Sequence, residues 1–211
     1  MSRVRVHGFS ISLDGFGTGD YQTLEEPFGH IGQRLHQWMF DAGAFGGTVK
    51  YGIVNDMLEH SGHRVGATIM GRNMFGPQRG PWQDDDDWKG WWGDNPPYHH
   101  PTFVMTHYPH ESIPMEGGTT FHFVQGTPQE VLAIAQETAG DLDICIRGGV
   151  HTLRDFFREG LVDEAHIVIS PVLAGRGERL WDDLDNFNDL YMVAESIGVG
   201  NHTHLRVVRR T

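Results

Sequence analysis

The chain has 211 residues, which suits one large domain or at most two small ones, and its hydrophobic content of 38% excludes disorder throughout. With 16 Lys and Arg against 28 Asp and Glu, the net charge of −12 argues against a nucleic-acid-binding surface. No apolar run approaches the roughly 18–20 residues that span a bilayer, and the first residues alternate like a strand and lack the apolar block of a signal peptide. A single cysteine, Cys145, excludes an internal disulfide and is compatible with a reducing cytoplasm. We expect a cytoplasmic protein with neither a nucleic-acid nor a membrane partner.

The first third of the chain alternates predicted strands with glycine-rich loops. Residues 4–12 alternate like a strand, and a glycine-dense loop follows from Leu13 to Asp20. Apolar residues at helical spacing then predict a helix, and a glycine-rich loop follows it over residues 41–50. A short helix is expected over 54–58 and a strand over 64–70. The residues that predict the first helix are Ile31, Leu35, Trp38 and Met39.

The stretch from Pro77 to Pro101 is the least regular part of the chain. It holds four of the six tryptophans and an acidic run at 84–87, which we interpret as a solvated loop in preference to a metal site. Tryptophan side chains in a polar loop are expected to be buried against a core, a ligand or a second subunit. Trp91, Trp92 and Tyr98 therefore line either the mouth of a substrate cavity or a homodimer interface, and the sequence leaves both open.

The second half of the chain alternates strands and helices. Strands are expected over 102–106, 121–124, 143–146 and 164–170. A capping box at Thr127–Glu130 opens a helix to Ala139, and Leu153, Phe156 and Phe157 lie inward on a helix that ends at Gly160. This alternation predicts a single α/β domain over 1–211, with a mainly parallel sheet covered on both faces. Residues 191–199 and 203–209 add an antiparallel pair at one edge.

Ligands of such sheets bind outside the carboxyl ends of the strands, where four turns are candidates. A Gly-Gly pair before a helix lets backbone approach a phosphate, while Arg72 and His107, with the Thr106 hydroxyl, suit a second phosphate. Each signal has a plain alternative: a tight turn, a surface arginine, or an Asp14 that only forms a turn. The four turns are Ser12–Gly15, Gly71–Asn73, Thr106-His107 and Gly148-Gly149.

Nearly the whole chain resembles the dihydrofolate reductase fold, and more closely its branch related to the C-terminal reductase domain of the bifunctional riboflavin-biosynthesis protein. The resemblance implies a three-layer α/β/α domain and an NADPH-dependent reductase of a small heterocycle, such as a pterin or pyrimidine. We expect the chain to form a homodimer. The matching motifs are Ser10-Ile11-Ser12-Leu13-Asp14-Gly15, Ile69-Met70-Gly71-Arg72, Ile144-Cys145-Ile146-Arg147-Gly148-Gly149, and the run from Leu153 through Leu161 to Gly175.

The resemblance also implies roles for individual residues. Gly71, Arg72, Thr106 and His107 would lie along the adenosine-phosphate side of NADPH, and the loop 13–19 would close over the nicotinamide. The pyrophosphate would be held by Gly148, Gly149, Val150, His151 and Leu153. We expect the substrate side to be formed by Ser12, Asp14, Trp38 and Phe75, with Asp14 as the candidate catalytic carboxylate.

Two positions depart from the riboflavin branch. Phe16 stands where a Lys is typical, and Arg147 stands where a Glu is typical, both on the substrate side. These departures keep a second class open: a catalytically silent nucleotide- or ligand-binding module on the same fold. The 14 histidines lack the helical spacing of a zinc hydrolase, so no metal is expected.

Overall fold

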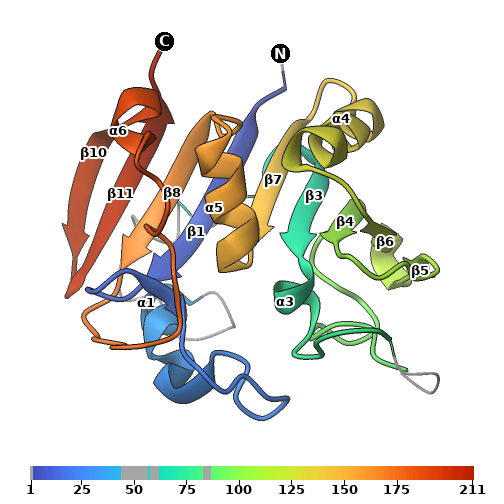
Figure 1. Cartoon of the computed structure of the whole chain (residues 1–211), viewed down its shortest axis with the longest axis horizontal. Coiled ribbons are helices and arrows are strands. Elements are labelled where there is room, and N and C mark those ends of the chain that lie inside the picture. Colours follow the sequence, from blue (N-terminus) through green and yellow to red (C-terminus); the bar gives the residue numbers. More distant parts are fainter. Residues whose placement is uncertain (1, 44–56, 58–61, 83–86) are drawn as a thin grey trace.

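The computed structural model describes residues 2–43, 57, 62–82 and 87–211 (Figure 1). Two expectations fall outside this part of the chain. The short helix over 54–58 is described only at Met57, and the acidic run 84–87 only at Asp87.

The described residues form a nine-stranded sheet in the order β10-β11-β8-β1-β7-β3-β4-β6-β5 (Figure 1). The six strands from β8 to β6 run parallel, while β5, β11 and β10 are antiparallel to their neighbours. The predicted α/β class and its antiparallel C-terminal pair are therefore confirmed. The strands are β1 (Val4–Ile11), β3 (Val65–Gly71), β4 (Pro101–Met105), β5 (Ile113–Pro114), β6 (Thr120–Val124), β7 (Asp143–Gly148), β8 (Glu164–Ile169), β10 (Tyr191–Val199) and β11 (His202–Arg209).

Helices α4 (Pro128–Ala139) and α5 (Val150–Arg158) cover one face of the sheet (Figure 1). The predicted capping box is present: the Glu130 amide donates to the Thr127 hydroxyl at 3.3 Å, and the Thr127 amide donates to Glu130 Oε2 at 2.8 Å. Fully buried side chains of α5, such as Leu153 and Phe156, pack on apolar residues of the central strands. This core fixes the position of the start of α5 relative to the strand ends.

The first predicted helix differs from the expectation. Residues Gly29–His36 form a 3-10 helix, and the α-helix α1 covers only Gln37–Asp41. Gly32 interrupts the 3-10 helix at φ 58°, a backbone conformation that favours glycine, so the apolar spacing does not extend into one continuous helix. Trp38 of α1 packs with Val168 on the face of the sheet opposite α5, since neighbouring residues of a strand point to opposite faces.

Several short elements lie around the sheet. The strands β2 (Phe16–Thr18) and β9 (Glu178–Arg179) pair as a separate antiparallel ribbon, which the sequence did not predict. Helix α3 (Arg72–Phe75) forms where only a turn was expected. The remaining short elements are the 3-10 turn at Glu116–Gly118 and α6 (Phe187–Leu190).

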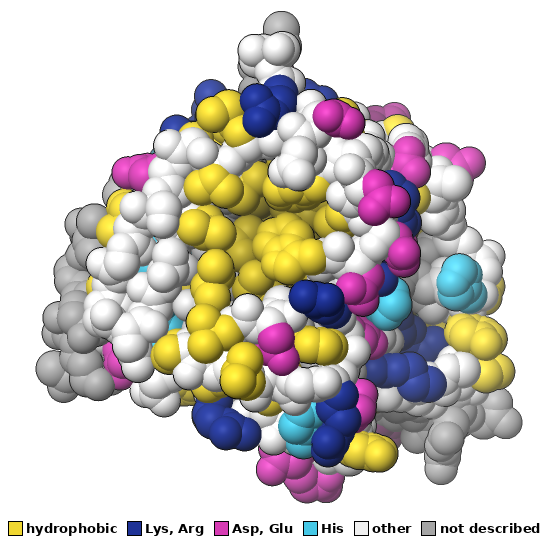
Figure 2. Space-filling view, turned by 60° about the vertical axis from the view of Figure 1, so that its left-hand side comes forward, with side chains coloured by type: hydrophobic (Ala, Val, Ile, Leu, Met, Phe, Trp, Pro, Cys, Tyr) yellow, Lys and Arg dark blue, Asp and Glu magenta, His cyan; other side chains and the backbone are white. Residues whose placement is uncertain are grey.

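Hydrophobic side chains gather on the surface beside β10 and β11 (Figure 2). Met192 and Val193 of β10 are 42% and 49% exposed, and Leu205 and Trp181 are partly buried against the core. None of these four residues lines the cavities described below. No helix in the described part of the chain is long and apolar enough to cross a membrane.

Candidate functional site

Three of the four predicted turns meet in one cavity of about 400 Å³. The strands that precede them run parallel, so their carboxyl ends share one edge of the sheet. Arg72 follows β3, Thr106 and His107 follow β4, and Gly149 follows β7; all four residues line this cavity. The fourth turn, Ser12–Gly15, contributes no residue to it.

Two arginines line the first cavity, together with the carboxylates of Asp155 and Glu178. Arg72 donates to the Gly80 carbonyl at 3.1 Å and to Gln78 Oε1 at 3.3 Å, and its guanidinium carbon lies 3.4 Å from the centre of the Trp82 ring. Arg79, which the sequence did not single out, also lines the cavity and donates to Gln22 Oε1 at 2.8 Å. Both guanidinium groups are held in place by protein contacts, which prepares them to bind an anion.

The start of α5 forms the opposite wall. Gly149 is the residue before the helix, and the first amides, at Val150, His151 and Thr152, have no acceptor within the helix. A side chain on Gly71 would collide with Thr152 Oγ1, so glycine lets the end of β3 approach the start of α5. Leu153, expected beside the pyrophosphate, is instead fully buried in the core.

A second cavity of about 570 Å³ lies beside the first. Its polar wall includes His7 and Ser10 from β1 and Arg147 from the end of β7. Seven aromatic and thioether side chains also line it. Those residues are Phe9, Phe28, Met39, Phe40, Met74, Trp91 and Trp92.

The two cavities adjoin at four residues that line both: Asn73, Gly149, Val150 and Glu178. Asn73 Nδ2 donates to Glu178 Oε1 at 3.2 Å, and His151 Nε2 lies 3.8 Å from Glu178 Oε2. Strand β9 therefore delivers a carboxylate to the junction. The two cavities together form one groove along the edge of the sheet.

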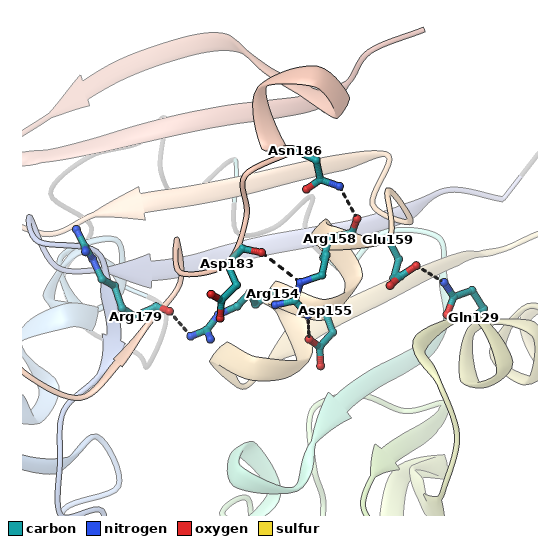
Figure 3. Close-up of polar contacts among 8 residues, drawn as sticks. All are labelled: Gln129, Arg154, Asp155, Arg158, Glu159, Arg179, Asp183 and Asn186. Carbon is teal, nitrogen blue, oxygen red and sulfur yellow. Dashed lines mark hydrogen bonds and ion pairs between the residues drawn. The ribbon is translucent and has the colours of Figure 1, made fainter.

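Polar contacts from α5 hold the segment around β9 in place (Figure 3). Arg154 donates to the carbonyl of Arg179, the residue next to Glu178. Arg158 donates to the Asp183 carbonyl at 3.2 Å, and Asn186 donates to the Arg158 carbonyl at 2.9 Å. The same helix thus supplies the amides of one wall and positions the carboxylate at the junction.

Asp14 has a different place from the one expected for a catalytic or substrate-side group, because it lines neither cavity. Its carboxylate accepts hydrogen bonds from the amides of Ala174 at 3.0 Å and Gly175 at 2.7 Å, and from the Ser12 hydroxyl at 2.6 Å. Partial burial raises the pKa of Asp14, but these hydrogen bonds outweigh it and lower the pKa to about 2. The structure gives Asp14 the turn-forming role that the sequence left open.

The other substrate-side candidates also lie outside both cavities. Ser12 is fully buried and accepts from the Phe16 amide at 2.9 Å. Trp38 is 3% exposed and donates to the Ser10 hydroxyl at 2.8 Å, and Phe75 is 1% exposed in an aromatic cluster. The side chains of Trp38 and Phe75 are buried in the core, which their spacing in the sequence did not predict.

The aromatic residues of the irregular stretch separate into two groups. Trp91 and Trp92 line the second cavity, whereas Tyr98 is 8% exposed and packs with Phe121. Of the two departures from the expected pattern, Arg147 lines the second cavity and Phe16 lines neither. His36 and Glu178, which line the second cavity, carried no recognisable signal in the sequence; only the folded chain brings them to it.

Comparison with known proteins identifies the family. The family model described as the RibD C-terminal domain matches residues 6–204. The chain belongs to the RibD C-terminal domain family. The resemblance inferred from the motifs is thereby confirmed. Comparison with the sequences of curated proteins gives no match.

Solved structures agree with this RibD C-terminal domain assignment. A putative riboflavin biosynthesis protein from Shewanella sp. PV-4 is 25% identical with a TM-score of 0.62, and the match covers 100% of both chains. Dihydrofolate reductase from Enterococcus faecalis, complexed with NADP(H), is 13% identical with a TM-score of 0.56 over 100% of this chain and 97% of that one. A deaminase/reductase from Thermotoga maritima is 10% identical with a TM-score of 0.57, over 99% of this chain and 57% of that one.

These comparisons show the dihydrofolate reductase-like fold that the motifs predicted. Membership of the RibD C-terminal domain family, with reductases among the structural neighbours, supports an oxidoreductase-like function. The groove along the strand ends is the place in this chain where such chemistry fits.

Proposed function

We propose that this chain is an NADPH-dependent reductase of a small heterocyclic substrate. One observation carries the proposal: a cavity at the strand ends, with two arginines in its wall, continues through four shared residues into a larger cavity with several aromatic side chains. A dinucleotide needs such an extended groove, with charge at one end and flat apolar walls at the other.

The residues of the first cavity suit the phosphates of NADPH. Arg72 and Arg79 bring two guanidinium groups to one wall, where Thr106 and His107 add further hydrogen-bonding groups. This donor set fits a 2′-phosphate, and it favours NADPH over NADH. The amides at the start of α5, from Val150 onward, fit the pyrophosphate.

The second cavity then holds the nicotinamide ring and the substrate. When bound, NADPH supplies the hydride, so the chain's own task is to orient two rings and exclude water between them. Trp91 and Trp92 contribute flat walls for this purpose, and Glu178 stands at the junction within the groove. The reduction proposed here is related to that of the riboflavin-pathway pyrimidine reductases.

Thermal unfolding in the presence of cofactor tests the proposal. NADPH at 100 times its Kd stabilises the folded state by about 2.7 kcal/mol, which raises the melting temperature by several degrees. NADH at the same concentration should raise it less. Equal shifts with both cofactors would contradict the 2′-phosphate site. No shift with either would show that the chain does not bind a nicotinamide cofactor, and the reductase proposal would be wrong.

A second candidate is a binding module without catalysis. It is favoured by one observation: Asp14, the expected catalytic carboxylate, is engaged with the loop at Ala174 and Gly175. Cofactor binding without NADPH oxidation in the presence of pterins and pyrimidines would support this alternative. The expected homodimer stays a prediction, which sedimentation at micromolar concentration tests.

A further inference from the structure

Arg147 is a cation without a protein counterion among the described residues. It occupies the position before Gly148-Gly149 and lines the second cavity. Its Nε atom is enclosed and has no hydrogen-bond partner, and no ion pair joins its guanidinium to a described acidic side chain. Arg147 is half-buried, and a guanidinium that lacks a protein counterion at a cavity is available to bind an anion from outside the chain.

Arg5 provides an internal comparison. It lies on β1, whose residues pair with β7, so it is a neighbour of Arg147 on the same part of the sheet. The Nε of Arg5 lies 3.0 Å from Asp143 Oδ2, an ion pair that satisfies its charge within the protein. Of the two arginines, only Arg147 faces the second cavity, and only Arg147 lacks such a partner among the described residues.

The titratable groups near Arg147 do not compensate its charge. Burial, then the charges of Arg5 and Arg147, lower the pKa of His7 to about 3, so His7 is neutral at neutral pH. Burial lowers the pKa of His36 to about 4. The one carboxylate among the described lining residues, Glu178, accepts a hydrogen bond from Asn73 at the junction with the first cavity.

Two further polar atoms of this cavity wall are enclosed without a partner in the described structure: Nε2 of His7 and Nδ1 of His36. Buried polar groups normally have hydrogen-bond partners, so each unsatisfied one at a cavity needs an explanation. Together with Arg147, they offer one cationic and two neutral hydrogen-bonding groups. Aromatic side chains line the same cavity, Phe9, Phe28 and Trp92 among them.

We propose that the second cavity takes a planar ring that carries an oxyanion, a carboxylate or a phosphate, and that Arg147 binds this oxyanion while His7 and His36 hydrogen-bond the ring's polar atoms. This inference deepens the proposed function and rests on it for the view that this cavity is the substrate's end of the groove. It differs from the expectation set by the riboflavin branch, in which a Glu is typical at this position.

Matched ring compounds that differ only in charge test the proposal. Isothermal titration measures the binding of 2-naphthoate, 2-naphthyl phosphate and the neutral 2-naphthamide, with and without saturating NADPH. At least one of the two anions should bind about tenfold or more tightly than the amide, as a charge-assisted hydrogen bond implies. Comparing the two anions decides between a carboxylate and a phosphate.

Arg147→Met removes the charge and keeps much of the side-chain volume. We expect it to bring the anion-to-amide ratio to within about twofold and to leave NADPH affinity unchanged. Arg147→Lys keeps the charge and should keep part of the preference, which covers the case in which the methionine variant does not fold. Arg72→Ala is the matched control: it should weaken NADPH and leave the ratio unchanged.

Three results would overturn the proposal. Both anions could fail to bind at millimolar concentration, the preference could persist in Arg147→Met, or that variant could lose NADPH affinity as strongly as anion affinity, which would assign Arg147 to the cofactor. Failure of the proposed function can be told apart from failure of this inference. If the protein bound no NADPH but still preferred the anions in an Arg147-dependent way, the reductase proposal would be wrong and the anion site would be supported.

Discussion

The guanidinium carbon of Arg72 lies 3.4 Å from the centre of the Trp82 ring, so the indole forms the surface on which this arginine rests. Trp82 is itself fixed, because its Nε1 donates to the Tyr108 carbonyl at 3.0 Å and its ring packs against Phe123. The loop after α3 and the loop after β4 thus hold one cation between them. The position of Arg72 therefore depends on a residue ten positions later in the sequence.

Arg72→Ala should weaken NADPH much more than NADH. Loss of a charge-assisted contact to the 2′-phosphate costs about 1.5–3 kcal/mol, which is roughly a 10- to 150-fold rise in the Kd of NADPH. Isothermal titration with both cofactors measures the difference. If the two affinities fell equally, Arg72 would be a structural residue only.

Trp82→Leu should have a smaller effect in the same direction. Removing the aromatic face takes away about 0.5–2 kcal/mol of cation–π attraction and loosens the guanidinium, so the Kd of NADPH should rise about 2- to 30-fold. Trp82→Phe keeps a ring under Arg72 and serves as the control. A phenylalanine variant as weak as the leucine variant would show that the Nε1 hydrogen bond to Tyr108 matters and the stacking does not.

The sequence predicted the central strands well, because alternation and buried apolar runs are local properties. The turn positions of Arg72, Thr106 and Gly149 followed from the same pattern, since parallel strands end at one edge. The orientation of large side chains did not follow. Trp38 and Phe75 are aromatic residues of the kind that often line binding sites, yet tertiary packing buries both in the core.

The sequence also did not predict which residues reach the groove through pairing between strands that are far apart in the chain. Glu178 reaches the groove only because β9 pairs with β2, more than 150 positions earlier, and because Arg154 holds the neighbouring carbonyl. The break in the first helix depends on the positive φ of Gly32, which a spacing pattern does not encode.

Asp14→Ala should destabilise the fold without affecting cofactor affinity. The variant loses the acceptor for the amides of Ala174 and Gly175 and for the Ser12 hydroxyl, at a cost of about 1–2 kcal/mol. Urea denaturation at pH 7 measures the loss. A large fall in NADPH turnover at unchanged stability would instead restore a catalytic role for Asp14.

The same carboxylate should contribute to acid sensitivity. Because the folded-state pKa of Asp14, about 2, lies below its ordinary value of 3.8, its contribution is present above about pH 4 and is lost as the pH falls towards 2. Asp14→Ala should therefore show a shallower loss of stability between pH 4 and pH 2 than the wild type. Parallel curves for the two proteins in that interval would contradict the assignment.

A pair of histidines should make stability begin to fall at a higher pH than Asp14 does when the solution is acidified. His166 Nε2 and His204 Nδ1 are 2.9 Å apart, so one donates and the other accepts, and both rings are neutral. Burial lowers the pKa of each to about 4, with His166 and His202 adding to the effect on His204. Since the unfolded chain takes up protons first, stability should fall as the pH drops from about 6.5 towards 4.

His204→Gln tests this pair. The variant removes one of the two titrating rings, so its stability should fall less than that of the wild type between pH 7 and pH 4, by on the order of 1–2 kcal/mol. Urea midpoints at pH 7, 5.5 and 4.5 provide the measurement. An unchanged slope would show that other groups set the acid response.

Gly71→Ala should damage the first cavity through a purely steric effect. The backbone of Gly71 is ordinary, with φ −79° and ψ 156°, so alanine causes no conformational strain there. Its new methyl group, however, would collide with Thr152 Oγ1 and lie 3.3 Å from the Gly149 amide. Overpacking of this kind costs about 1–3 kcal/mol and displaces the start of α5 from the strand ends, so NADPH affinity should fall together with stability. Adding Thr152→Ala removes the colliding oxygen, so the double variant should recover most of both losses, as thermal unfolding and cofactor titration would show. If stability recovered without cofactor affinity, the Thr152 hydroxyl itself would be a contact of the cofactor. If neither recovered, the clash would be with the Gly149 backbone.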